Sequence, residues 1–325
     1  MTKVCAIDRA VQIVIVTPKV GEVATGNRCS ADQWEKVFLA LGHEVVVTGV
    51  GDDVGSGFDV LVALNAKRIH GVIEEFKAKN PIGRVIVVLT GTDIYPEPGK
   101  VALESMEKAD WLVALQGKAV AQVPVEWRGK ITVILQAAVA GESREKSSEF
   151  FDVAVVGHLR KVKDPMQTAA ASRLLPDDSR VRVRQVGAIL EDDYGDLIQK
   201  EMADNPRYEC LGELNPTDAA LLTAGSHLLV VSSLSEGAPR VVGEAVVNET
   251  PVVSSRIDGV VGLLGEDYPG YFSVGDTEEL SKLIWKAESD EIFYQELIDA
   301  CRKVAGQFSP EAEIEAWRSL LEELK

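Results

Sequence analysis

Two glutamates, Glu236 and Glu244, are separated by seven residues across a predicted loop-to-helix junction. The run His-Leu-Leu-Val-Val at 227–231 is apolar and branched, which predicts a strand of a covered parallel sheet ahead of the loop. Pro239 suits the first turn of the helix, because N–H groups in the first turn have no hydrogen-bond partner within the helix and a missing N–H costs nothing there. A carboxylate in the loop can accept from a sugar hydroxyl and one on the helix from a ribose, while the helix N-terminus faces a diphosphate.

The alternative interpretation is a solvated helix start with ordinary surface glutamates. The position after a buried strand favours the binding site, since open α/β sheets bind ligands at the carboxyl ends of their strands. Gly237, Ala238 and Arg240 lie between the two glutamates and are expected to line the same site.

Strand-like apolar runs alternate with helical patterns along the whole chain, which predicts an α/β fold with parallel sheets. The predicted strands of the first half are 12–16, 44–48, 60–64, 85–89, 111–115 and 132–135, and those of the second half are 151–156, 180–186, 208–211, 228–231 and 252–254. The polar stretch 141–149 predicts a linker. We therefore expect an N-terminal Rossmann-like domain at 1–145, a C-terminal one at 150–305 and a final helix within 306–325.

The segment from Glu236 to Ala245, with Pro-Val-Val-Ser-Ser at 251–255, resembles the signature of retaining glycosyltransferases of family 4. That resemblance implies the GT-B fold, in which two Rossmann-like domains with parallel sheets face a cleft and the final helix packs back on the first domain. Further motifs resemble the selenosugar synthases of selenoneine biosynthesis, a branch of that superfamily. These motifs are Gly26-Asn27-Arg28, 89–95, 156–160 with 163–165, 205–208 and 262–272.

In the first half, Gly26, Asn27 and Arg28 precede a helix predicted to begin at Ser30, where backbone donors and a guanidinium can hold an anion. An exposed loop tip is the alternative for Arg28. Two further loops leave the predicted strands 60–64 and 85–89. Their candidate ligand contacts are Lys67, Arg68, Thr90, Gly91, Thr92 and Asp93.

The GT-B resemblance implies that the 90–93 loop contacts acceptor or donor sugar, with Asp93 orienting the acceptor or binding a sugar hydroxyl. A simple turn is the alternative. Where the family usually has a histidine this chain has Asn65, which leaves a proton-transfer role there in doubt.

In the second half, the segment from Gly157 to Lys163 resembles the Gly-Arg-Leu-x-x-x-Lys motif of family 4. The resemblance implies that Lys163 neutralises the leaving diphosphate. His158 stands where the family has arginine, so Arg160 becomes the expected second cation. The loop of Gly212, Glu213 and Leu214 resembles the place where backbone groups hold a uracil ring.

The net charge of −17 is concentrated in residues 151–325, which carry 17 basic and 32 acidic side chains against 17 and 19 in residues 1–150. A negatively charged protein repels other polyanions, which argues against nucleic acid or an anionic membrane as the main partner. The sequence has no apolar run long enough to insert into a membrane and no secretion signal, so we expect a cytoplasmic protein. No metal-binding motif is recognisable, and we expect no metal or other cofactor.

The resemblance implies a selenosugar synthase, an enzyme that joins selenophosphate to the anomeric carbon of a UDP-sugar and releases UDP and phosphate. The expected catalytic residues are Arg28, Asp93, Arg160, Lys163 and Glu236, with Glu244 on the ribose. An ordinary family 4 transferase with a hydroxyl acceptor is the runner-up, and a nucleotide-sugar binding protein is a third class. The choice between UDP-N-acetylglucosamine and UDP-glucose, the anomeric outcome and the oligomeric state stay open.

Overall fold

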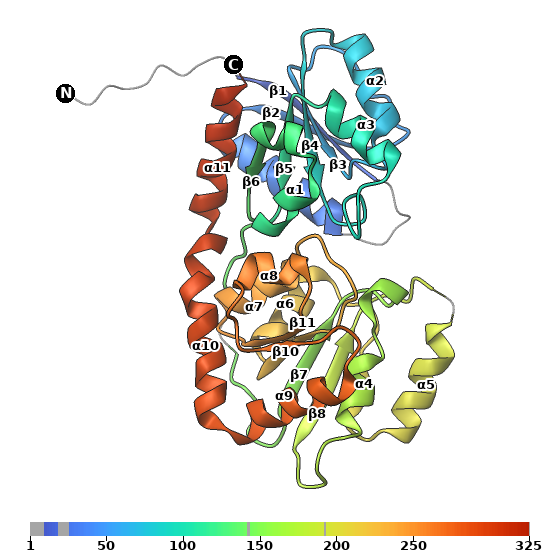
Figure 1. Cartoon of the computed structure of the whole chain (residues 1–325), viewed down its shortest axis with the longest axis vertical. Coiled ribbons are helices and arrows are strands. Elements are labelled where there is room, and N and C mark those ends of the chain that lie inside the picture. Colours follow the sequence, from blue (N-terminus) through green and yellow to red (C-terminus); the bar gives the residue numbers. More distant parts are fainter. Residues whose placement is uncertain (1–9, 19–25, 142–143, 192, 325) are drawn as a thin grey trace, which may run out of the picture. The chain divides into compact units, whose positions relative to one another are not determined.

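The computed structural model describes residues 10–18, 26–141, 144–191 and 193–324, which fold into two compact units (Figure 1). The first unit contains the described residues up to Leu115, Val120–Ile134 and the described residues from Glu313 onward. The second contains Gln116–Ala119 and the described residues of Leu135–Ala312. Residues 142 and 143 of the predicted linker lie outside the described residues.

The first unit is built on a six-stranded parallel sheet with the strand order β2-β1-β3-β4-β5-β6. Its strands carry the branched apolar residues that favour buried parallel sheets, and β3 is buried along its whole length. The elements are β1 (Gln12–Thr17), α1 (Gly26–Ala40), β2 (Glu44–Gly49), β3 (Val60–Leu64), α2 (His70–Lys79), β4 (Arg84–Leu89), α3 (Lys100–Lys108), β5 (Trp111–Ala114), η1 (Gly117–Gln122), η2 (Val125–Lys130) and β6 (Ile131–Val133).

The second unit has its own six-stranded parallel sheet, with the order β12-β11-β10-β7-β8-β9. The strands of this sheet and the helices packed against it share one apolar core. The elements are β7 (Phe151–Val156), η3 (Lys161–Lys163), α4 (Gln167–Ser172), β8 (Val181–Val186), α5 (Tyr194–Asp204), β9 (Tyr208–Cys210), α6 (Pro216–Ala224), β10 (Leu228–Val231), α7 (Arg240–Val247), β11 (Val252–Ser255), α8 (Asp258–Leu264), β12 (Tyr271–Phe272), α9 (Thr277–Ser289), α10 (Glu291–Ala305) and η4 (Gly306–Phe308), followed by α11 (Pro310–Glu323).

Two parallel sheets confirm the predicted α/β fold, and every predicted strand has a counterpart within a residue or two. The sequence missed β12, because a two-residue strand is too short to show a period. The break between the units falls after Ile134, ahead of the polar 141–149 stretch. Residues 135–140 belong to the second unit, where the Ala138 amide donates to Phe308 O at 2.9 Å.

The prediction that the first helix begins at Ser30 is wrong, since α1 already includes Gly26. Asn27 and Arg28 therefore lie in its first turn. Ser30 does not cap the helix: its hydroxyl is buried and donates back to Gly26 O at 2.9 Å. The apolar period that marks the helix begins only with Ala31 and Trp34, which is why the polar first turn looked like a loop.

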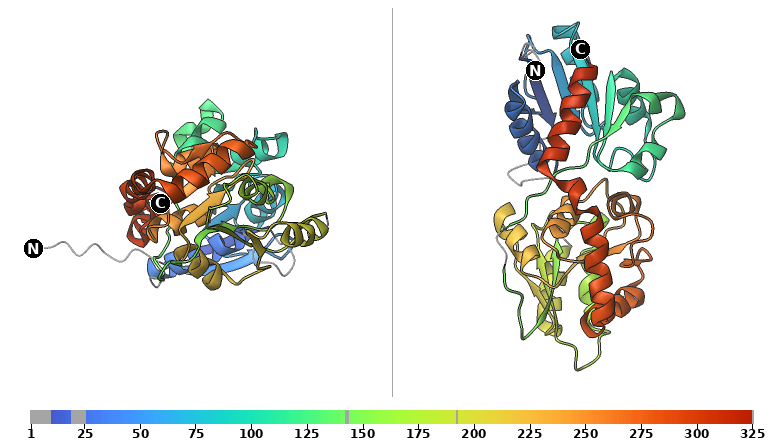
Figure 2. Two further views of the ribbon diagram at one scale, coloured as in Figure 1. Left: turned by 90° about the horizontal axis from the view of Figure 1, so that it is seen from below. Right: turned by 90° about the vertical axis from the view of Figure 1, so that its left-hand side faces the viewer.

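The last helix, dark red in Figure 2, packs its residues from Glu313 onward on the first unit. The Trp317 ring meets Trp34 and Phe38 edge to face, with centroids 5.2 and 4.9 Å apart. The buried Glu313 carboxylate accepts from Trp34 Nε1 at 2.8 Å and from Gln33 Nε2. These contacts join α11 to α1 of the same unit.

None of the helices in the described ranges has the length and apolar character that a bilayer crossing requires. The cytoplasmic location expected from the sequence stays a prediction.

Trp317→Ala should destabilise the first unit by about 3–5 kcal/mol, because it empties a fully buried indole site against two aromatic rings. Chemical denaturation followed by circular dichroism measures the change. The neighbouring Arg318→Ala, an exposed position, is the matched control and should change stability by less than about 0.5 kcal/mol. Equal effects of the two variants would contradict the packing described for α11.

Candidate active site

The strand order of the second sheet places a topological switch point between β7 and β10. Helical connections leave these two neighbouring strands in opposite directions along the sheet, and such points form crevices at the carboxyl ends of the strands. The loop after β7 carries Gly157 to Lys163, and the loop after β10 carries Ser232 to Glu236. The strand order therefore brings together two motifs that are about 75 residues apart in sequence.

Across this switch point Lys163 Nζ forms an ion pair with Glu236 Oε1. The Ser233 hydroxyl donates to the same carboxylate oxygen at 2.7 Å. The side chains of Lys163 and Glu236 are 21% and 12% exposed, so water screens their interaction less than at an open surface. The structure thus pairs two residues that the sequence assigned separately to the diphosphate and to the sugar.

The loop after β8 approaches the β7 loop closely, and the loop after β9 contacts the β8 loop. A Cβ atom on Gly187 would lie 2.1 Å from Gly157 O, so this approach requires glycine. The Gly187 amide donates to Gly212 O at 2.8 Å, and Gly212 has a left-handed φ of +71°. His158 joins the same group, since its Nδ1 accepts from the Ala188 amide at 3.3 Å.

The remaining predicted residues of this half lie around the same edge. Gly212, Glu213 and Leu214 form the loop between β9 and α6, and Glu213 is exposed. Arg160 precedes η3 and is partly buried, with no hydrogen-bond partner for its Nε among the described residues. Among the described residues, Lys163 pairs with Glu236, whereas Arg160 forms no ion pair with it.

Glu244 lies in the second turn of α7, one turn after Arg240 on the same face. Arg240 Nε is 4.0 Å from Glu244 Oε1, and the Glu244 side chain is 29% exposed. Burial raises the pKa of Glu244, and the charge of Arg240 opposes that rise. Pro239 caps α7 instead of lying inside its first turn, and Gly237 and Ala238 form the loop that leads to it.

A small cavity of about 20 Å³ lies among the carboxyl ends of the central strands of this sheet. Gly157, Lys163, Pro165, Ser233 and Pro239 contribute to its lining. A volume of this size holds about one water molecule. It marks the space between the Lys163 turn and the start of α7.

The first sheet has its own switch point between β1 and β3, where the strand order 2-1-3-4 reverses direction. Arg28, in the first turn of α1, follows β1, while Lys67 and Arg68 follow β3. Arg28 Nε pairs with Asp32 Oδ1 at 2.8 Å and is half exposed; Lys67 and Arg68 are both exposed. Three cations therefore flank this switch point, with Asn27 partly buried and Gly26 exposed beside Arg28.

Asp93 lies inside its own loop. It is 1% exposed, and its carboxylate accepts from the amides of Ala66, Thr90 and Gly91 at 2.8 to 3.3 Å. Burial raises the pKa of Asp93, although these backbone hydrogen bonds oppose the rise. Asp93 therefore holds the 90–93 loop against the Asn65 loop. Its expected contact with an acceptor or a sugar hydroxyl stays a prediction.

Asn65 supports the same loop. Its backbone has a left-handed φ of +75°, which asparagine tolerates better than most residues. Its side-chain amide donates to the hydroxyls of Thr90 and Thr92 at 3.0 and 3.1 Å. Asn65 therefore suits the backbone conformation of its loop and supports the 90–93 loop through its side chain.

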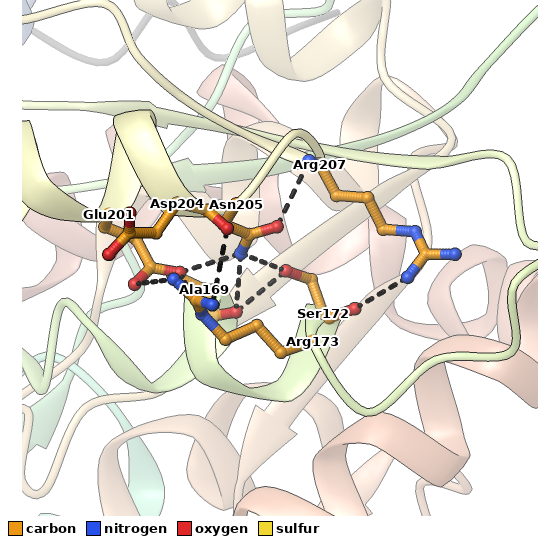
Figure 3. A network of polar contacts seen from close by, with 7 residues as sticks. All are labelled: Ala169, Ser172, Arg173, Glu201, Asp204, Asn205 and Arg207. Atoms are coloured by element: carbon orange, nitrogen blue, oxygen red, sulfur yellow. Dashed lines mark hydrogen bonds and ion pairs between the residues drawn. The ribbon is translucent and has the colours of Figure 1, made fainter.

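The Asn205–Tyr208 motif lies away from the strand carboxyl ends, between the end of α5 and the first residue of β9 (Figure 3). Asn205 Nδ2 donates to Ala169 O, Ser172 Oγ and Glu201 Oε1, and Arg173 forms two hydrogen bonds to the Glu201 carboxylate. This network joins α4, α5 and the start of β9. The motif is therefore structural, although it contributed to the resemblance.

Sequence reasoning missed the roles of Ser232 and Ser233. Both are 2% exposed and follow β10 directly. The only sequence signal was a pair of small hydroxyl residues after a buried strand. No cluster of three or more metal-ligating side chains occurs in the parts of the chain that the structure covers.

Comparison with protein families matches residues 141–304, about half of the chain, to the model described as glycosyl transferases group 1. A relative from Xenopus tropicalis, "Glycosyltransferase 1 domain-containing protein 1", is 22% identical over 276 residues, which are 76% of this chain and 79% of the relative.

Solved structures share the fold over nearly the whole chain. Anabaena Alr3699/HepE in complex with UDP and glucose is similar with a TM-score of 0.73 at 15% identity, covering 96% of this chain and 100% of that one. Sucrose-phosphate synthase from Thermosynechococcus elongatus is similar with a TM-score of 0.77 at 15% identity, covering 97% and 99%. The predicted GT-B fold, with its two Rossmann-like domains, is thereby confirmed.

Glu244→Gln should stabilise the protein increasingly as pH rises above the ordinary glutamate value of 4.5. The raised pKa means that the folded chain binds a proton more tightly than the unfolded chain, so ionisation costs stability until pH exceeds the folded pKa. The gain of the variant should then level off. Denaturation midpoints between about pH 4 and 8 measure it.

Glu249→Gln is the control, and its effect on stability should have the opposite sign, because the Arg302 side chain lowers the pKa of the exposed Glu249. That variant should lose a little stability at neutral pH, and the loss should vanish as pH falls through the folded pKa. A Glu244→Gln stability difference that does not change with pH would contradict the raised pKa of this partly buried carboxylate.

Proposed function

This chain belongs to the glycosyl transferase group 1 family, and we propose that within it the enzyme is a selenosugar synthase that joins selenophosphate to a UDP-sugar. The observation that most supports a UDP-sugar as the donor is the Lys163–Glu236 ion pair at the switch point of the second sheet. The proposed donor is UDP-N-acetylglucosamine or UDP-glucose. The complex of Alr3699/HepE with UDP and glucose supports a UDP-sugar for a chain of this fold.

In the proposed complex, Glu244 accepts from the ribose hydroxyls and Glu236 from a sugar hydroxyl. Lys163 and Arg160 neutralise the diphosphate, and the first N–H groups of α7 face it. The loop at Gly212, Glu213 and Leu214 holds the uracil ring. A diphosphate that takes Lys163 as its partner separates the lysine from Glu236, which frees the carboxylate for the sugar.

Arg28, Lys67 and Arg68 support an anionic acceptor on the first unit. They flank the switch point of its sheet, and none of the three side chains is buried. An acidic chain attracts an anion only where a local group of cations overrides the overall field. Selenophosphate, which is small and highly charged, fits such a group better than a long neutral glycan.

The arrangement around Asp93 also favours selenophosphate over a hydroxyl acceptor. A sugar hydroxyl must lose its proton to a general base during transfer. The Asp93 carboxylate is occupied by backbone amides, and Asn65 has no titratable group. An acceptor that is already an anion needs no strong base, and positioning and charge neutralisation supply the catalysis.

The proposed step forms a bond between selenium and the anomeric carbon while the bond from that carbon to the diphosphate oxygen breaks. UDP leaves with the electron pair of the broken bond. Water then cleaves the Se–P bond, which releases phosphate and leaves the selenosugar. Lys163 and Arg160 stabilise the leaving charge, so we propose that the reaction uses no resident metal.

The test incubates the protein with freshly generated selenophosphate and either UDP-sugar, and follows products by mass spectrometry. We expect a sugar product with the selenium isotope pattern, and UDP in equal amount. Arg28→Ala should lower this turnover more than it weakens UDP binding, since Arg28 is assigned to the acceptor. Transfer to a sugar or lipid hydroxyl without any selenium product would refute the proposal and support an ordinary family 4 transferase.

The same assay in EDTA tests the role of the cations. Turnover should persist, because arginine and lysine side chains carry the leaving charge. Loss of activity that magnesium or manganese restores would contradict the assignment of Arg160 and Lys163.

A further inference from the structure

The two oxygens of the Glu236 carboxylate have different surroundings. Oε1 receives both the Ser233 hydroxyl, at 2.7 Å, and the Lys163 ammonium. Among the described residues no hydrogen bond reaches Oε2. The carboxylate is therefore oriented by one oxygen and has the other available for a ligand.

The backbone of Ser233 is held by the neighbouring strand. The buried Ser255 hydroxyl, at the end of β11, donates to Ser233 O at 2.5 Å. The Glu236 backbone is held as well, since a Cβ atom on Gly259 of α8 would lie only 2.2 Å from Glu236 O. Two neighbouring elements thus fix both ends of the Ser233–Glu236 loop.

Ser232, the adjacent residue, holds the other partner of the ion pair. Its hydroxyl donates to the backbone carbonyls of Lys163 and Asp164 at 3.2 and 3.0 Å. The Leu234 amide also donates to Val162 O at 2.8 Å. The residues after β10 therefore set the position of the lysine turn and of the glutamate together.

We propose that Ser233 is a positioning residue for donor recognition: its hydroxyl holds Glu236 Oε1, so that Oε2 accepts from a hydroxyl of the donor sugar. This inference rests on the proposed function, in which Glu236 binds the sugar. Without the serine hydroxyl, Lys163 is the only side chain that orients the carboxylate. When the lysine moves to the diphosphate, the carboxylate therefore loses its fixed position. The sugar then loses its oriented acceptor while the nucleotide keeps its contacts.

The test is Ser233→Ala, with dissociation constants for UDP, UDP-glucose and UDP-N-acetylglucosamine measured by calorimetry. A hydrogen bond to a charged group contributes enough free energy for a change of about tenfold in affinity. We expect the better UDP-sugar to bind about tenfold more weakly and UDP to bind as before. Equal weakening of UDP and UDP-sugar, or no weakening of either, would overturn the inference.

Ser226→Ala is the matched control. Ser226 is also a buried serine of the second unit, 1% exposed, and its hydroxyl donates to Leu222 O at 2.7 Å after α6. Removing it should leave the ratio of UDP-sugar to UDP affinity unchanged. A change in that ratio as large as for Ser233→Ala would mean that lost stability, and not carboxylate position, is measured.

A double-mutant cycle with Glu236→Ala separates positioning from a general structural role. In the Glu236→Ala background, Ser233→Ala should cost little further UDP-sugar affinity, because the carboxylate that the serine orients is gone. Additive losses would contradict the proposal. If the unaltered chain binds neither UDP nor a UDP-sugar, the proposed function fails; if it binds both and Ser233→Ala changes neither, only the positioning role fails.

Discussion

The ion pair between Lys163 and Glu236 depends on the constraint that organises the second unit, the reversal of strand order between β7 and β10. Because the two strands are neighbours, the loops that leave them meet at one edge of the sheet. The surrounding residues then hold the pair in place: Gly157 lies against the lysine side chain, Ser232 holds its backbone, and Ser233 holds the carboxylate. A sugar nucleotide that separates the two charges would replace the ion pair by two interactions, one between Lys163 and the diphosphate and one between Glu236 and the sugar.

Opposite charges placed in this way compensate one another within the second unit. In the proposed function a diphosphate takes over the compensation of the Lys163 charge from Glu236, which a neutral ligand could not do. On α7, partial burial raises the pKa of the Glu244 carboxylate, so its ionised form is favoured less in the folded chain than in water. Carboxylates with a perturbed pKa are often found in binding sites.

The fold was readable from the sequence because buried parallel strands leave continuous branched apolar runs, such as 60–64 and 228–231. The positions of Glu236 and Glu244 followed from the same runs, since a loop and helix after a strand have a fixed place on the sheet. The start of α1 was missed because its first turn, from Gly26, has no apolar period. The pairing of Glu236 with Lys163 was not readable, because the partners lie far apart in sequence.

Asp93 illustrates the same limit. Its sequence context, a Thr-Gly-Thr-Asp loop after a strand, is shared by ligand-binding loops and by tight structural turns. Only the fold brings the Ala66 amide, 27 residues earlier, onto its carboxylate. Local pattern thus predicts which edge of a sheet a residue occupies, whereas the partner of a polar side chain there is set by the neighbouring strand.

We propose that Lys163 and Glu236 bind different parts of one sugar nucleotide. A crystal structure of the full chain with UDP-glucose or UDP-N-acetylglucosamine bound tests it most directly. We expect Lys163 Nζ within hydrogen-bond distance of a diphosphate oxygen, Glu236 Oε2 on a sugar hydroxyl and Glu244 on the ribose. A bound nucleotide sugar that leaves the Lys163–Glu236 pair intact, or that lies at another edge of the sheet, would contradict it.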